Sequence, residues 1–331
     1  SFGVNNENFL TTEKGTRRTP RPGFRTTEDK RYALPDGRIA VLGGAKYTGN
    51  QVDTIELDGS TTSVKTAETS GDVGQCGSRI LAITDTKESP SIADAAFEAY
   101  AAQENNEDAV PEALTAVVQL NAPDGDAPRI LAVTPVIDNV VSGHNMFACE
   151  GDVITQQSLE EVKPGTPDNM TAHERYRWVL RRWDLSTGER MNIPVTDPNG
   201  EPFESTDKWF LSGYQGVQVG NEYRLMTRND LALAVDLTSG QARRLFYMDS
   251  RKHTPGGNWL TYQVDKDGVY ALEETHEDHV ITLFYRPWDG KEWREIFSTE
   301  DLSGYLKEGW FSRELKVQSF AVRPGWNGGA Q

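Results

Sequence analysis

Histidine and cysteine are the side chains of this sequence best suited to chemistry at neutral pH, and the chain contains five histidines and two cysteines. His276 and His279 lie in the acidic segment 274–279, which offers imidazoles and carboxylates, ligands that zinc and other transition metals bind. The segment also has the composition of a tight hairpin turn, in which the two rings need not converge, and no helix presents them as zinc ligands. We therefore interpret it as an exposed polar turn, keep His276 and His279 as metal candidates, and expect neither a metal nor a cofactor.

The two cysteines occupy matching positions in consecutive repeats of the sequence. Cys76 and Cys149 each lie in the first strand of a predicted unit, and each is followed directly by a short turn. Matching positions in neighbouring units lie close together, so we predict a disulfide between them. The alternative is a pair of buried, inert thiols, since free cysteine is commonly a core residue. A disulfide would require an oxidising compartment.

Aromatic and histidine side chains gather in the segments that connect the predicted strands. Rings with a polar edge can stack on sugars or grip peptide side chains, which makes them candidates for ligand binding. The alternative is that such rings wedge neighbouring sheets together. The residues that we predict to bind a ligand are His144, Trp209, Tyr214, His253, Trp259 and Trp310.

The elements that must position these residues form a repeat. An alternating apolar strand, a short turn rich in Asp and Gly, and a second alternating strand recur along the chain, as in residues 176–195. A pair of apolar strands precedes each such hairpin. These strand pairs begin the five predicted units and cover residues 33–42, 73–83, 145–155, 216–226 and 259–272. Four antiparallel strands at intervals of about 50 residues are typical of a β-propeller.

We therefore predict an all-β fold with a single β-propeller over residues 36–331, with five blades favoured and six as the alternative. Residues 315–322 form one further apolar stretch, and we expect this C-terminal strand to close the ring. A pair of β-sandwich domains is the competing architecture, because it also uses many short strands. No linker divides the chain after residue 35, and the hairpins recur across its middle, which favours the propeller.

Two insertions interrupt the repeat, each between the second and third strands of its unit. Ser89 precedes a first-turn proline and an alanine-rich stretch, residues 91–102, which predicts one short capped helix. We expect Phe97 and Tyr100 on this helix to form a side wall of the binding face. Residues 156–174 contain two proline turns and predict a long loop. On a propeller both insertions would rise from one face.

Residues 1–35 predict an extended segment whose charge is opposite to that of the rest. The chain carries 34 Lys and Arg against 50 Asp and Glu, a net charge of −16, whereas residues 14–31 are rich in lysine and arginine. We favour a linker or a belt across the acidic body over a membrane-proximal stalk near anionic headgroups. The overall acidity argues against nucleic acid as a partner, and no apolar run is long enough to predict a membrane span. The chain begins at Ser1 rather than Met, from which we hypothesise export.

Motifs for nucleotide binding, serine hydrolysis and paired-cysteine zinc sites are absent from the sequence. We predict a non-catalytic, extracytoplasmic protein, either secreted or associated with the cell envelope. In this interpretation it is a binding or scaffold protein that recognises a protein, peptide or glycan on its loop-rich face. The alternative is an enzyme on the same scaffold, either a glycoside hydrolase or lyase or a metal-dependent, lactonase-like hydrolase. The fold alone does not choose between these classes.

Overall fold

The computed structural model describes most of the chain, which divides into two compact units. The described residues are 9–12, 15–18, 30–45, 49–66, 69, 71–104, 111–122, 128–136, 140–141, 146–162, 176–203, 215–227, 230–248, 259–275, 280–300, 317 and 320–326. The first unit comprises Ser1–Lys46, Gln51–Ser63 and Met248–Gln331, and the second comprises Tyr47–Asn50 and Val64–Tyr247.

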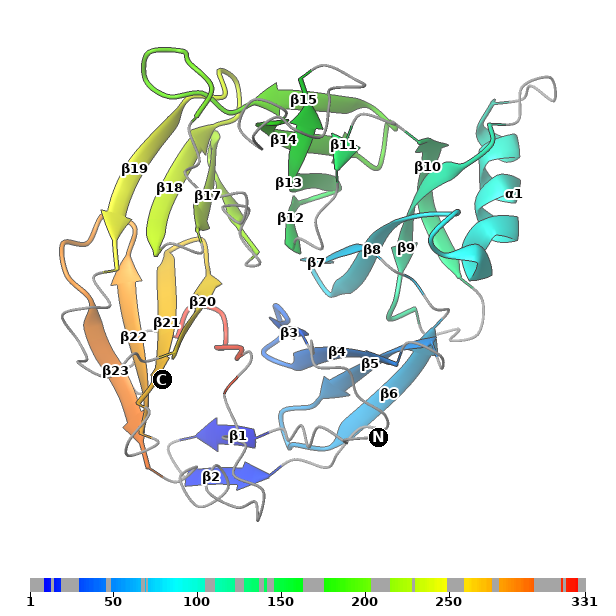
Figure 1. The fold of residues 1–331 in the computed structure, drawn as a ribbon. Helices are drawn as coiled ribbons and strands as arrows, with labels where there is room; N and C mark the ends of the chain where they lie inside the picture. Colours follow the sequence, from blue (N-terminus) through cyan, green and yellow to red (C-terminus); the bar gives the residue numbers. More distant parts are fainter. Residues whose placement is uncertain are drawn as a thin grey trace, which may run out of the picture. The chain divides into compact units, whose positions relative to one another are not determined.

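The second unit contains three four-stranded antiparallel meanders, in which neighbouring strands follow one another along the chain (Figure 1). The first meander consists of β7 (Asp72–Cys76), β8 (Arg79–Asp85), β9 (Leu114–Gln119) and β10 (Arg129–Pro135). The second consists of β12 (Met146–Glu150), β13 (Val153–Glu161), β14 (Tyr176–Asp184) and β15 (Arg190–Pro194). The third consists of β16 (Val217–Val219), β17 (Glu222–Met226), β18 (Leu231–Asp236) and β19 (Ala242–Tyr247). The short β11 (Val140–Val141) pairs with β13.

Two further meanders of the same kind lie mainly in the first unit. One consists of β3 (Lys30–Ala33), β4 (Ile39–Ala45), β5 (Gly49–Ile55) and β6 (Thr61–Thr66). The other consists of β20 (Trp259–Val264), β21 (Gly268–Glu274), β22 (Ile281–Pro287) and β23 (Arg294–Thr299). The second strand of the latter, β21, is buried at every position, whereas β22 alternates between buried and half-buried residues. Because successive strand residues point to opposite faces, β21 is covered on both of its faces.

The five meanders coincide with the five units predicted from the sequence, so the all-β fold of four-stranded antiparallel sheets is confirmed. Sheets of this kind are the blades of a β-propeller, which is the fold class of this chain. The number of blades and the closure of a ring stay predictions.

The predicted helical insertion is present, but Ser89 does not cap it. A 3₁₀ turn, η1 (Pro90–Ile92), leads into the helix α1 (Ala93–Glu104). The Ser89 side chain makes no capping hydrogen bond, and its hydroxyl lies 2.7 Å from the Thr84 hydroxyl instead. The helix packs against β9 and β10 (Figure 1). It therefore covers the third and fourth strands of its own sheet, with Phe97 and Tyr100 half-buried.

The long loop predicted for residues 156–174 begins later than expected, because β13 continues to Glu161. Its residues pair with β14 along the whole length, from Val153 opposite Asp184 to Glu161 opposite Tyr176. Gln157 and Ser158 are completely buried. A run of polar residues resembles a loop in sequence, but here the strand lies between two sheets that bury both of its faces.

The N-terminal segment, predicted to be extended, contains strands. β1 (Phe9–Thr12) pairs with β2 (Gly15–Arg18) as a hairpin, and β3 starts the first meander at Lys30. Tyr32 is the one buried residue of β3. A four-residue strand with one buried side chain shows too little alternation of apolar and polar residues for the sequence to predict it.

The C-terminal stretch 315–322 was predicted to be a strand, and its described residues are not. Gln263 on β20 accepts a hydrogen bond from the Val322 N–H at 2.6 Å and donates one to the Val322 carbonyl at 3.1 Å. Glu274 accepts a hydrogen bond from the Val317 N–H at 2.9 Å. Side chains of the segment then pack on the apolar face of the last meander; they are Val317, Phe320, Val322 and Trp326. A side-chain amide thus replaces the backbone of a neighbouring strand.

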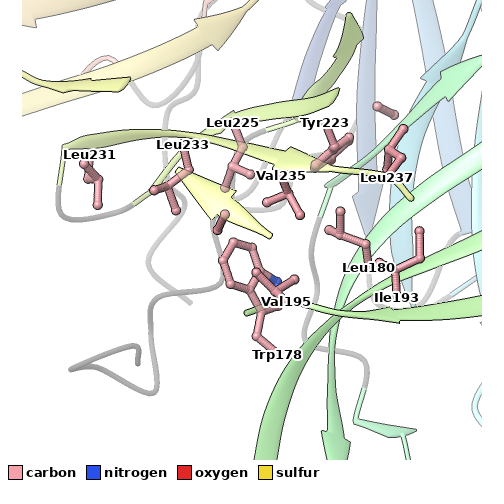
Figure 2. Close-up of a cluster of buried hydrophobic side chains, with 12 residues drawn as sticks. Trp178, Leu180, Ile193, Val195, Tyr223, Leu225, Leu231, Leu233, Val235 and Leu237 are labelled. Carbon is pink, nitrogen blue, oxygen red and sulfur yellow. The ribbon is translucent and has the colours of Figure 1, made fainter. Parts of the chain in front are cut away.

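An apolar cluster joins the meanders β12–β15 and β16–β19 of the second unit (Figure 2). Its largest members are Trp178, Leu180, Ile193, Tyr223, Leu225, Leu233 and Val235. The Trp178 ring also meets the ring of Phe203 edge-on, with centroids 5.8 Å apart. Alternate residues of β14 and β15 point into this cluster, so the opposite face of the same strands is available for another partner.

Backbone hydrogen bonds join the same two sheets beside this cluster. The Thr196 N–H donates to the Gly240 carbonyl at 2.9 Å, and the Thr196 carbonyl accepts from the Ala242 N–H at 2.7 Å. A Cβ added to Gly240 would lie 2.0 Å from the Pro194 carbonyl oxygen. The close approach of the two backbones therefore requires glycine at this position.

We predict that Gly240→Ala destabilises the protein far more than Gly188→Ala. Both glycines end equivalent outer turns with φ values of 75° and 76°, so both variants lose about 1 kcal/mol to the positive φ. A Cβ at Gly188 meets nothing within 4 Å, whereas a Cβ at Gly240 meets backbone. Urea denaturation should show Gly240→Ala losing at least about 2 kcal/mol more. Equal losses would contradict the close approach.

Candidate functional site

The meanders β7–β10 and β12–β15 are joined through their first strands, which pair in parallel (Figure 1). Val73 lies opposite Met146, Gly74 opposite Phe147 and Gln75 opposite Ala148. A Cβ on Gly74 would lie 2.3 Å from the Phe147 carbonyl oxygen, so glycine permits this approach. The parallel pairing fixes the register between the two sheets, and with it every contact across their interface.

The interface has two chemically different ends. The turn end is the end at which the tight β7–β8 and β12–β13 turns lie. The loop end is the opposite end, where the insertions between the second and third strands emerge. Toward the turn end the interface is apolar and contains Cys76, Leu81, Val117, Ala132, Ile154 and Trp183. Toward the loop end it contains charged side chains that the fold partly or wholly buries.

The cysteines lie at the turn end. Each directly follows the last paired residue of its strand, Gln75 in β7 and Ala148 in β12. Cys76 and Cys149 have Cα atoms 4.9 Å apart with their sulfur atoms in contact. Disulfides span Cα separations of roughly 4.4–6.8 Å, so the fold brings the two residues into a suitable position. Oxidation of this pair in the protein stays a prediction.

Two carboxylates of the β7–β10 sheet lie at the loop end. Asp72, the first residue of β7, is 1% exposed and accepts a hydrogen bond from the Gln156 side chain of β13. Asp85, the last residue of β8, accepts a hydrogen bond from the Thr115 hydroxyl at 2.6 Å. Asp72 therefore joins the two sheets, and Asp85 is held within its own sheet.

The β12–β15 sheet contributes a third carboxylate and its partners. Glu160 on β13 accepts hydrogen bonds from Arg177 Nε at 2.6 Å and from Asn192 Nδ2 at 3.2 Å. Glu160 is 9% exposed, so most of its surface is removed from water. Burial of a charge is costly unless the charge is paired, and here a guanidinium and an amide supply the pairing.

Arg181 lies directly opposite Gln156 in the register of β13 and β14. Burial lowers the pKa of Arg181, while the charges of Asp85, Asp72 and Glu160 act in the opposite direction. We call Asp72, Asp85, Gln156, Glu160, Arg177 and Arg181 the polar interface cluster. It combines cationic hydrogen-bond donors, anionic acceptors and one neutral amide within a pair of sheets whose register is fixed.

Most of the side chains predicted from the sequence to bind a ligand lie outside the described residues. These are His144, Trp209, Tyr214, His253 and Trp310, together with the metal candidates His276 and His279. Trp259 begins β20, but its side chain is likewise outside the described part. Their role stays a prediction. Among the residues that the structure describes, no group of three His, Cys, Asp or Glu side chains could hold a metal ion.

Sequence reasoning missed the polar interface cluster. The available signal was the spacing of polar residues at every second position of one strand, Gln156, Ser158 and Glu160, because such residues share a face. The residues that face Gln156 are distant in sequence: Asp72 is 84 residues away and Arg181 is 25 residues away. No local pattern relates them to Gln156.

Comparison with known proteins gives similarity of fold at low identity. No protein-family model matches the chain, and no curated protein sequence matches it. An acylaminoacyl peptidase structure is 14% identical with a TM-score of 0.41 over 89% of this chain, which spans about half (48%) of that protein. A quinoprotein alcohol dehydrogenase-like protein from Bacteroides thetaiotaomicron is 14% identical, with a TM-score of 0.41 over 88% of this chain and 61% of its own. BamB from Moraxella catarrhalis is 9% identical, with a TM-score of 0.33 over 80% and 74%.

We predict that the purified chain contains no titratable thiol until it is reduced. Cys76 and Cys149 are 73 residues apart in sequence, and closing a loop of this size stabilises the folded state by about 4 kcal/mol in chain-entropy estimates. Thiol titration in denaturant without reductant tests the bond. Urea denaturation of the Cys76→Ser, Cys149→Ser double variant measures its contribution. Two free thiols in protein purified from an oxidising compartment would show the prediction to be wrong.

Proposed function

We propose that this chain is a non-catalytic binding or scaffold protein that recognises a protein, peptide or glycan at the loop end of its β-propeller sheets. The observation that carries the proposal is the polar interface cluster. Its carboxylates, amide and guanidiniums lie at the loop end of two sheets, while the buried side chains of the turn end are apolar and its ion pair, Arg79 with Asp152, is exposed. The concentration of polar groups at one end supports a binding role for that end.

The chemistry of the cluster suits a ligand that both donates and accepts hydrogen bonds. Glycan hydroxyls and peptide amides have this property, and a small number of positioned polar groups is what gives a binding site its orientation and specificity. Asp72, Glu160 and Arg177 are fixed by hydrogen bonds to neighbouring strands, so they present little flexibility.

An extracytoplasmic location is part of the proposal. Its support is the position of Cys76 and Cys149, which suits a disulfide and hence an oxidising compartment. Separately, none of the described helices is long and apolar enough to cross a membrane.

The test is binding of the labelled, full-length chain to an array of neutral and acidic glycans and to an array of overlapping peptides. We expect saturable binding to one of these two classes. Trp209→Ala and Trp310→Ala should each weaken it by about tenfold, because a buried aromatic anchor contributes at least this much. Leu57→Ala is the control, since Leu57 is 67% exposed in the β5–β6 turn. Loss of affinity in the control equal to that in the tryptophan variants would contradict the proposed face.

Two other outcomes would overturn the proposal. One is the absence of binding to either array above that of a heat-denatured sample. The other is cleavage of a bound glycan during the assay, detected by mass spectrometry, which would assign the protein to the hydrolases or lyases instead.

A further inference from the structure

A row of nitrogen donors lies on the face of β14 and β15 that packs against the β7–β10 sheet. Arg181 pairs with Asn192 and Trp183 pairs with Arg190, and opposed residues of antiparallel strands share a face. The Arg190 guanidinium carbon lies 4.5 Å from the centre of the Trp183 ring. Arg190 Nη2 lies 3.4 Å from the Pro135 carbonyl oxygen at the end of β10. The row therefore borders β10 and β15, the fourth strands of two sheets.

Two groups in this row have no acceptor within the described part of the chain. Arg190 Nη1 and Trp183 Nε1 are buried without a hydrogen-bond partner there. Guanidinium and indole groups donate and cannot accept, so the partner that would satisfy them must be an acceptor.

The charges around the row favour a single negative charge between the two arginines. Burial lowers the pKa of Arg190 to about 10, and the positive charge of Arg181 contributes to this, whereas Asp85 opposes it. The nearby carboxylates already have donors of their own: Asp85 has Thr115, and Glu160 has Arg177. The repulsion between Arg181 and Arg190 is therefore not relieved by a direct ion pair.

We propose that Arg181 and Arg190 bind a monoanionic carboxylate, with the Trp183 indole N–H as a further donor. Planar guanidiniums pair with carboxylates through two parallel hydrogen bonds, which a point charge cannot match. Asp72, Asp85 and Glu160 lie close enough to disfavour a second negative charge, so the site selects against dianions. The carboxylate belongs either to a sugar acid or to a peptide C-terminus. The site shares Arg181 with the polar interface cluster of the proposed function, but it uses none of the loops that contain the aromatic candidates.

The test follows the Trp183 indole resonance in ¹H–¹⁵N spectra of the full chain, assigned by its loss in Trp183→Phe. The probes are D-glucuronate, N-acetylglycine and sulfate, each compared with sodium chloride at equal ionic strength. We expect a saturable shift with the two carboxylates and a dissociation constant for sulfate at least about tenfold higher. The carboxylate with the lower dissociation constant identifies the source.

Variants separate this site from general charge effects. Arg181→Gln should weaken carboxylate binding by at least about tenfold, and Arg181→Lys, which keeps the charge but not the planar fork, should weaken it nearly as much. Arg244→Gln is the matched control, because Arg244 is exposed on β19, and it should leave the dissociation constant unchanged. Circular dichroism tests whether each variant is folded. If Arg181→Gln does not fold, the dissociation constant of Arg181→Lys is compared with that of Arg244→Gln instead.

Three results would overturn the proposal. They are a Trp183 shift no larger than that with sodium chloride, sulfate binding as tight as carboxylate binding, and equal weakening by Arg181→Gln and Arg244→Gln. These results concern the isolated carboxylates and Arg181, whereas the proposed function is tested by array binding and by the loop variants Trp209→Ala and Trp310→Ala. Failure here is therefore distinct from failure of the proposed function.

Discussion

The parallel pairing of β7 with β12 is the constraint on which the rest of the second unit depends. Two antiparallel sheets that pack face to face could slide past each other, but a shared backbone ladder sets a single register. Gly74 makes the ladder sterically feasible, because any Cβ there would meet the Phe147 carbonyl. The same register aligns Cys76 with Cys149 and places Asp72 against Gln156. The apolar contacts, the proximity of the two cysteines and the polar contacts are thus consequences of one pairing.

The division of this interface into an apolar turn end and a polar loop end has an energetic reason. Charges are costly to bury, and they are tolerated where hydrogen bonds from another strand compensate the lost water. Glu160 has such bonds from Arg177 and Asn192. At the turn end apolar side chains such as Leu81 and Ile154 fill the interface, and the exposed ion pair of Arg79 with Asp152 joins the two sheets beside them. A sheet interface of this kind can be stable at one end and chemically specific at the other.

The fold could be predicted further than the site. Hairpins are local, so alternation and turn residues located all five meanders, and alanine-rich composition located α1. The prediction failed where partners are distant. β13 is polar beyond Thr155, yet it continues because β14 pairs with it and the sheets on both sides bury it. The stretch near Val322 is apolar, yet a Gln263 amide holds it in place of a strand.

The sequence by itself determined the elements: four-stranded antiparallel sheets, one helical insertion, an acidic body and two cysteines at matching positions. Only the tertiary structure decided which side chains meet. Arg181, Asp72 and Glu160 come from strands far apart in the chain, and their proximity follows from sheet register rather than from spacing. The physical reason is that secondary structure depends on neighbours along the chain, whereas a site depends on contacts between chain segments that only packing brings together.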